Sequence, residues 1–152
     1  MILGIDPGPV ESAYCYVARE FEVRTAGKVD NDILISDFLK IDPAIREVAI
    51  ESIQSYGMMI GRSVFDTCYM IGRIIQVCRD RGIPCSLYPR PEYARRICGV
   101  GKVNDAVLRQ SLLLRFGGDK KGEPLFALKG NSDKRSAFAV AVYHIDVSTR
   151  GK

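Results

Sequence analysis

Short apolar runs that end in turn residues divide the first part of the chain into strands. Residues 2–6 are apolar up to Asp6, and the Pro-Gly pair that follows is typical of a buried strand entering a turn. Residues 12–18 and 21–27 are rich in strand-favouring residues, and a tight reversal is expected between them. Three consecutive strands at this spacing predict an antiparallel meander.

The rest of the chain is predicted to combine two further strands with five helices. The strands are expected at residues 48–50 and 83–88, and the helices at 32–39, 58–79, 92–97, 104–116 and 132–145. Residues 117–130 are loop-like, with glycines and lysines.

The long helix predicted at 58–79 carries apolar residues on more than one face. Phe65, Tyr69 and Met70 extend its apolar surface, and Gly72 offers a small surface that another backbone can approach. A helix of this kind is usually covered by the sheet on one side and by something else on the other. A partner subunit is one candidate for that cover, and it would place Phe65, Tyr69 and Gly72 at a dimer interface.

The pattern as a whole predicts one α/β domain that spans residues 1–152. Its centre is expected to be a five-stranded mixed sheet, three antiparallel strands followed by two parallel ones, flanked by helices. A net charge of +4 permits a nucleic-acid partner without demonstrating one.

Composition excludes several classes of protein. The apolar runs are too short to span a membrane, and the N-terminus lacks the pattern of a secretory signal, so we expect a cytoplasmic protein. The five cysteines include no Cys-x-x-Cys pair, and His144 is the single histidine, which argues against a zinc site. We expect reduced, structural thiols, and His144 as a helix residue with a satisfied partner.

Three acidic residues are candidates for a metal site. Asp6 and Glu51 each follow an apolar strand, and in adjacent parallel strands their carboxylates would lie side by side. Asp133 lies in the first turn of the last helix, at the polar end of an inward face. Together they would offer oxygen ligands to hard divalent ions. Taken singly, Asp6 is equally a turn former, Glu51 a solvated strand end and Asp133 a helix N-terminal carboxylate.

An ordered set of motifs resembles the RuvC-type Holliday junction resolvases of the RNase H-like superfamily, and its phage-borne members most. The matching stretches are IDPGPVESAY at 5–14, VAIE at 48–51, YPRP at 88–91, GVGKVNDAVLRQ at 99–110 and SDKRSAFAVAVYH at 132–144. Each motif alone is weak, but their order across nearly the whole chain is fairly specific.

The resemblance implies an RNase H-like fold, a homodimer, Mg²⁺ or Mn²⁺, and paired nicking of four-way DNA junctions in a bacterial or phage-infected cell. Asp6, Glu51 and Asp133 fill three acidic positions. The fourth, usually Asp in the family, is Ser136, which would bind metal through water. This departure leaves open whether the site holds its second ion.

The expected reaction is hydrolysis of a phosphodiester by in-line attack of water. One ion would activate the water and a second would stabilise the leaving 3′ oxygen, with Asp6 between the ions and Glu51 and Asp133 as outer ligands.

Basic residues in two clusters and on the long helix are expected to bind DNA phosphates, although a solvated surface is the plainer interpretation. We expect contact from Arg62, Arg90, Arg95, Arg96, Lys102, Lys120, Lys121, Lys129, Lys134 and Arg135. Gln54, Tyr56 and Met58 are candidates for a wedge at the junction crossover, although core or interface packing suits Met58 equally well.

Two other functions compete with a nuclease. Ser136 favours a branched-DNA-binding protein that kept the fold and lost or weakened its chemistry. The Asp-x-Gly opening is shared with actin-like sugar kinases and ATPases, but that class needs a second domain, which 152 residues do not supply. A P-loop NTPase is excluded because the chain has no Gly-x-x-x-x-Gly-Lys-Ser/Thr motif.

Overall fold

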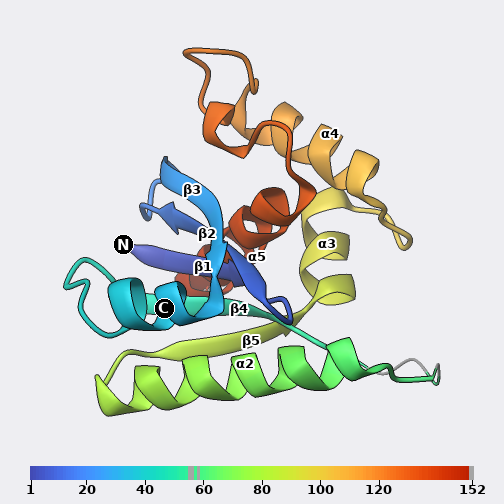
Figure 1. The fold of residues 1–152 in the computed structure, drawn as a ribbon. Coiled ribbons are helices and arrows are strands. Elements are labelled where there is room, and N and C mark those ends of the chain that lie inside the picture. Colours follow the sequence, from blue (N-terminus) through green and yellow to red (C-terminus); the bar gives the residue numbers. More distant parts are fainter. Residues whose placement is uncertain (55–56, 58, 151–152) are drawn as a thin grey trace.

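A mixed β-sheet runs through the centre of the protein in a computed structural model that describes residues 1–54, 57 and 59–150 (Figure 1). Within these residues the sheet has five strands in the order β3-β2-β1-β4-β5. β1, β2 and β3 pair antiparallel, whereas β4 pairs parallel with both β1 and β5. The predicted mixed sheet is therefore confirmed. The strands are β1 (Ile2–Asp6), β2 (Glu11–Val17), β3 (Val23–Asp30), β4 (Glu47–Ser52) and β5 (Cys85–Pro89).

Helices connect and cover these strands. A helical segment after β3 begins as one short α-turn and continues as a π-helix, and a 3₁₀ turn lies in the segment predicted as a loop. The helical elements are α1 (Asn31–Ile33), η1 (Leu34–Leu39), α2 (Arg62–Asp80), α3 (Arg90–Cys98), α4 (Asp105–Phe116), η2 (Phe126–Leu128) and α5 (Ser132–Arg150).

The two faces of the sheet build two apolar cores. Side chains alternate along each strand, so Ile2 and Ala49 pack with α3, α4 and α5, while Leu3 and Ile50 pack with η1 and α2. Figure 1 shows α5 behind the sheet on one face and α2 running along the other. Alternate residues of β1 and of β4 therefore face opposite helical layers.

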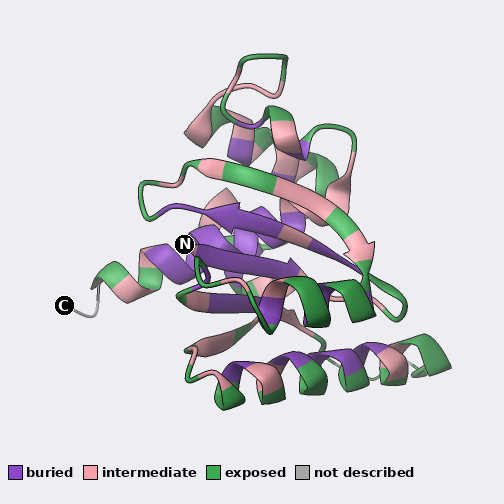
Figure 2. Cartoon of the chain, turned by 60° about the vertical axis from the view of Figure 1, so that its left-hand side comes forward, coloured by how far each residue is buried: buried purple, intermediate pink, exposed green. Residues whose placement is uncertain are grey.

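Helix α5 lies directly against β1 because β1 has a glycine at the crossing. A Cβ atom added at Gly4 would lie 2.0 Å from the carbonyl oxygen of Ala137 and 2.9 Å from the Cβ of Ala141. Residues 136–145 of α5 are all buried, as Figure 2 shows for most of this helix. The absence of a side chain at position 4 therefore fixes how close α5 comes to the strand that carries Asp6.

Several predicted boundaries were wrong. The long helix begins at Arg62 rather than at 58, because Gly61 has extended backbone angles of φ −83° and ψ 169°; Met58 lies outside the described residues. The third strand begins at Val23 rather than at Phe21, because the reversal extends through Phe21, which has a positive φ of 65°. It also runs three residues beyond Gly27, since its pairing with β2 continues to Asp30. The last helix continues past Ile145 to Arg150.

The faces of α2 also differ in part from the prediction. Its buried face is formed by Thr67, Met70, Ile71, Ile74 and Cys78, so Met70 belongs to the core rather than to the second apolar face. No helix within the described residues is long and apolar enough to cross a membrane.

Candidate catalytic carboxylate site

Asp6 and Glu51 lie at equivalent positions on neighbouring parallel strands. Ile5 of β1 is opposite Ile50 of β4, and each carboxylate is the next residue of its strand. Asp6 is two positions from Gly4 and Glu51 two from Ala49, so alternation turns both side chains to the face covered by α5. The two strands that carry Asp6 and Glu51 are thus adjacent and parallel, as the sequence suggested.

Asp133 approaches the same place from the first turn of α5. Its charge acts on both Asp6 and Glu51 and favours their protonated forms. Its carboxylate accepts a hydrogen bond from Lys28 Nζ at 2.9 Å, across from β3. Asp133 thus lies close enough to the two strand carboxylates to act on both of them electrostatically.

The electrostatics of this cluster are most unfavourable at Asp6. Burial, followed by the charges of Glu51 and Asp133, raises the pKa of Asp6 to about 8, although Arg90 and Lys28 oppose the rise. Burial also raises the pKa of Glu51, and a hydrogen bond of 2.6 Å from the Tyr93 hydroxyl partly offsets that effect. Carboxylates held together in this way are strong candidates for stabilisation by a cation.

Two hollows border Asp6. One of about 250 Å³ is lined by Asp6, Glu11, Lys28, Asp133 and the Pro-Gly-Pro turn after β1. Another of about 320 Å³ is lined by Asp6, Glu51, Thr67 and neighbouring residues of α2. The carboxylates are therefore open to small ligands from two sides.

The donor set fits a hard divalent ion in its chemistry. Carboxylate oxygens are the ligands that Mg²⁺ and Mn²⁺ take in proteins. Among residues 1–54, 57 and 59–150, no group of three or more acidic, histidine or cysteine side chains is already arranged around one point as a metal site. Lys28 is ion-paired with Asp133 and would have to yield to an ion, whereas Tyr93 donates to one oxygen of Glu51 and leaves the other oxygen to an ion.

Ser136 lies one helical turn after Asp133 in α5 and is buried, with 2% of its surface exposed. Arg90 Nη1 donates a hydrogen bond of 2.9 Å to its hydroxyl, and the Tyr93 hydroxyl is a further hydrogen-bond partner. At the position where the resemblance implies a fourth acidic residue, the chain thus has a serine whose hydroxyl is already hydrogen-bonded to Arg90 and Tyr93.

Several residues of the site were missed by the sequence analysis. Lys28 lay just beyond the predicted end of the third strand, and Tyr93 and Asp105 reach Glu51 and Arg90 from helices distant in sequence. A prediction that continued the third strand past Gly27 would have included Lys28 and suggested it as a site residue. No local pattern indicates the tyrosine or the aspartate, because their roles depend on how α3 and α4 pack.

The predicted DNA-binding residues occupy different environments. Arg95, Arg96, Lys102, Lys120, Lys121 and Lys129 are exposed, and so is Arg62 at the start of α2. Lys134 and Arg135 are partly buried and donate to the carbonyls of Ala127 and Leu128. Lys102 and Arg90 line a hollow of about 750 Å³ that also includes Glu51 and Gln54. Of the proposed wedge, Tyr56 and Met58 lie outside the described residues.

The proposed dimer face is exposed in the single chain. Phe65 is 52% and Tyr69 69% exposed, and nothing lies within 4 Å of a Cβ placed on Gly72. Figure 2 shows exposed residues along the outer side of α2. An apolar surface of this kind is available to a partner.

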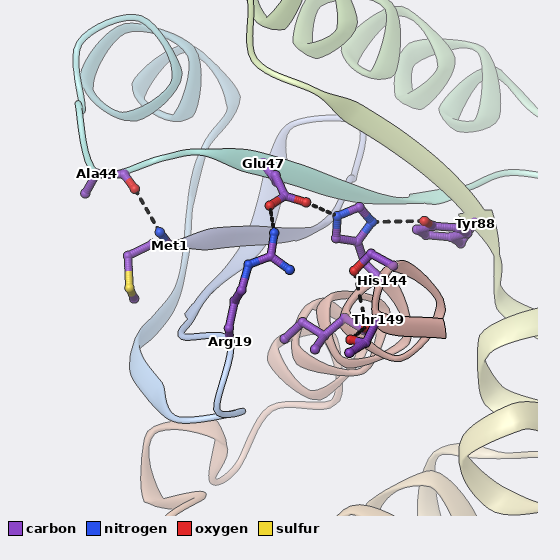
Figure 3. Close-up of polar contacts among 9 residues, drawn as sticks. Met1, Arg19, Ala44, Glu47, Tyr88, His144 and Thr149 are labelled. Carbon is purple, nitrogen blue, oxygen red and sulfur yellow. Dashed lines mark hydrogen bonds and ion pairs between the residues drawn. The ribbon is translucent and has the colours of Figure 1, made fainter. Parts of the chain in front are cut away.

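His144 is a buried helix residue with two partners, as predicted. Its ring nitrogens hydrogen-bond with the Tyr88 hydroxyl at 2.9 Å and with Glu47 at 2.8 Å, and Arg19 pairs with the same carboxylate (Figure 3). This network joins α5, β5 and the beginning of β4, at the opposite end of β4 from Glu51. All five cysteines are free.

Comparisons with known proteins show likeness at the level of structure. No protein-family model and no curated protein matches the sequence. The solved structure of Thermus thermophilus RuvC matches with a TM-score of 0.77 at 17% identity, over 99% of this chain and 96% of that one. T. thermophilus RuvC in complex with Holliday junction substrate matches with a TM-score of 0.77 at 16% identity, over 99% and 95%. The chain therefore has the RuvC-like, RNase H-like α/β fold.

Proposed function

We propose that this protein is a divalent-metal-dependent endonuclease that resolves four-way or other branched DNA junctions. The observation that carries the proposal is that Asp6 and Glu51 lie side by side on adjacent parallel strands, with Asp133 close enough to raise the pKa of both. The likeness to a RuvC structure in complex with Holliday junction substrate supports DNA of this kind as the substrate class. We take residues 1–152 as a single nuclease domain.

Asp6, Glu51 and Asp133 would hold Mg²⁺ or Mn²⁺. When bound, a divalent ion supplies positive charge that polarises the phosphate and lowers the pKa of bound water. Asp6 is the last residue of β1 and Glu51 lies in the adjacent strand β4, so both are positioned by rigid backbone. In the reaction, water adds to phosphorus and the bond to the 3′ oxygen breaks, which leaves a 5′-phosphate and a 3′-hydroxyl.

The remaining residues bind and orient DNA in this proposal. Exposed lysines and arginines around the site would contact phosphates without reading sequence. Lys28 neutralises Asp133 in the free protein and, once released, is placed to contact the substrate backbone. Two chains paired through the outer face of α2 would present two sites to one junction, as paired nicking requires. The phage-like character is proposed from the sequence resemblance, and the cytoplasmic location from composition together with that resemblance.

Cleavage assays test this function directly. The protein is incubated with a four-way junction and with a linear duplex of matched sequence, in Mg²⁺, Mn²⁺ or EDTA. We expect paired nicks in the junction with either ion and no nicks in EDTA. Asp6→Asn should abolish nicking and leave junction binding intact, while Glu20→Gln, an exposed substitution, should cleave as the wild type does. Unchanged cleavage by Asp6→Asn would refute the site.

A second candidate is a branched-DNA-binding protein without chemistry. The observation that favours it is the serine at position 136, whose hydroxyl is bonded to Arg90. Tight junction binding with no nicking under any of the three conditions would decide for this alternative.

A further inference from the structure

Arg90 is the first residue of α3, and its side chain is held between two other helices. Nη1 donates to the Ser136 hydroxyl of α5 at 2.9 Å, and Nη2 donates to Asp105 in the first turn of α4. About a third of the side chain is exposed, at 31%. Two directed contacts fix the guanidinium plane, so its charge has a definite position.

That position is inside the carboxylate site. The positive charge of Arg90 opposes the rise in pKa of both Asp6 and Glu51. Arg90 also lines the large hollow beside Glu51, which gives its exposed edge access to solvent and to substrate. The guanidinium is thus a charged group of the site, in contrast to Arg95 and Arg96 on the exposed side of α3.

Arg90 is ion-paired with Asp105, and Ser136 adds a neutral hydrogen-bond acceptor rather than a second carboxylate. The buried hydroxyl accepts from Arg90 and is also hydrogen-bonded with Tyr93, so it is oriented toward protein groups. An aspartate at this position would lie one helical turn after Asp133, on the same side of α5. It would meet the guanidinium directly and form an ion pair with it.

We propose that the guanidinium of Arg90 supplies the second positive charge of the site, so that the carboxylates hold one divalent ion per chain and Arg90 binds the scissile phosphate. This inference rests on the proposed nuclease function and deepens it. It assigns Arg90 a catalytic contact and Asp105 a positioning role.

The chemistry of the guanidinium suits this task. Arginine stays protonated, and its planar set of five N–H donors matches the oxygens of a phosphate. Two contacts within the protein leave donors for non-bridging oxygens, where charge develops during attack by water. Fixed donors at such a position typically contribute about 10²–10³-fold to a rate.

Metal stoichiometry tests the inference without relying on activity. Mn²⁺ binding to the free protein is measured by titration calorimetry and by electron paramagnetic resonance. We expect one ion per chain for the wild type, for Arg90→Gln and for Ser136→Asp, because the new carboxylate pairs with Arg90. The double variant Arg90→Gln/Ser136→Asp should bind two ions, since the carboxylate is then released.

Cleavage of the junction gives a second, independent readout. Arg90→Gln should lower kcat about 100-fold and change the Kd for the junction by less than about threefold, whereas Arg90→Lys should retain part of the rate. Arg46→Gln, which removes an exposed arginine at the other end of β4, is the control and should cleave normally. Arg90→Gln and Arg90→Lys change a single, partly exposed side chain and should fold. Their cleavage rates therefore test the inference even if the double variant is unstable.

Each contrary outcome has a distinct meaning. Two ions bound to the wild type, two bound to Ser136→Asp alone, or full activity of Arg90→Gln would overturn the role of Arg90 while leaving the nuclease function standing. One ion bound to the double variant would likewise overturn it. A wild type that binds no ion and cuts no junction would instead refute the proposed function, and the inference with it.

Discussion

Tyr93 donates a hydrogen bond to Glu51 across 2.6 Å, from the middle of α3 to the end of β4. The tyrosine is fully buried, so its hydroxyl has a fixed place, and it holds one oxygen of a carboxylate that we assign to metal binding. Groups that hydrogen-bond to a metal ligand fix its orientation, and losing them commonly lowers the affinity for the metal.

Replacing Tyr93 with phenylalanine should therefore weaken metal binding. We expect the affinity for Mn²⁺ to fall by about 10–100-fold, the usual cost of losing such a partner, with little change in stoichiometry. Tyr143→Phe is the matched control, because it removes a hydroxyl bonded to Glu92, outside the carboxylate site. Equal affinities of the two variants, measured by titration calorimetry, would show that Tyr93 is only structural.

The contact between β1 and α5 at Gly4 predicts a large loss of stability. In Gly4→Ala the new methyl group meets the backbone of Ala137, which cannot move without displacing the helix. We expect a loss of about 3 kcal/mol, at the upper end for an overfilled core, measured by urea unfolding. Gly101→Ala, with nothing within 4 Å of the added Cβ, should change stability by less than about 0.5 kcal/mol.

The Glu47 network predicts a stability change with pH. Burial alone would raise the pKa of Glu47, but the hydrogen bond with His144 and the charge of Arg19 outweigh it, and the net pKa is lowered from 4.5. Its stabilisation is therefore present above pH 4.5 and is lost as the pH falls through the lowered value.

Glu47→Gln should consequently be less stable than the wild type at pH 7. The difference between their free energies of unfolding should become smaller as the pH falls below about 4.5. Thermal unfolding at pH 7, 5.5 and 4 measures the two curves. Glu20→Gln, at an exposed position, should follow the wild type throughout. A deficit that stays constant over this range would mean that the Glu47 charge contributes nothing.

The exposed apolar face of α2 predicts dimerisation. Phe65→Asp/Tyr69→Asp places two charges on this face, and we expect a monomer by light scattering where the wild type is a dimer. Leu114→Asp replaces an equally exposed apolar residue on α4 and should remain dimeric. A wild type that is monomeric, with or without junction DNA, would contradict the proposed interface.

Most of the fold was predictable because its signals are local. Apolar runs ending at Asp6 and Glu51 marked the two central strands, and helical spacing marked α2 and α5. The boundaries were less secure. The starts of β3 and α2 depend on single backbone conformations, at Phe21 and Gly61, which no periodic pattern encodes.

The sequence by itself determined the sheet and its helices and singled out three carboxylates as candidates, since strand alternation and chain order follow from near neighbours. Only the tertiary structure decided what surrounds those carboxylates. Lys28 and Tyr93 hydrogen-bond to Asp133 and Glu51 from elements far away in the chain, and Arg90 donates to Ser136 because α3 and α5 pack side by side. Side-chain partners across such distances are set by packing, which the linear pattern does not contain.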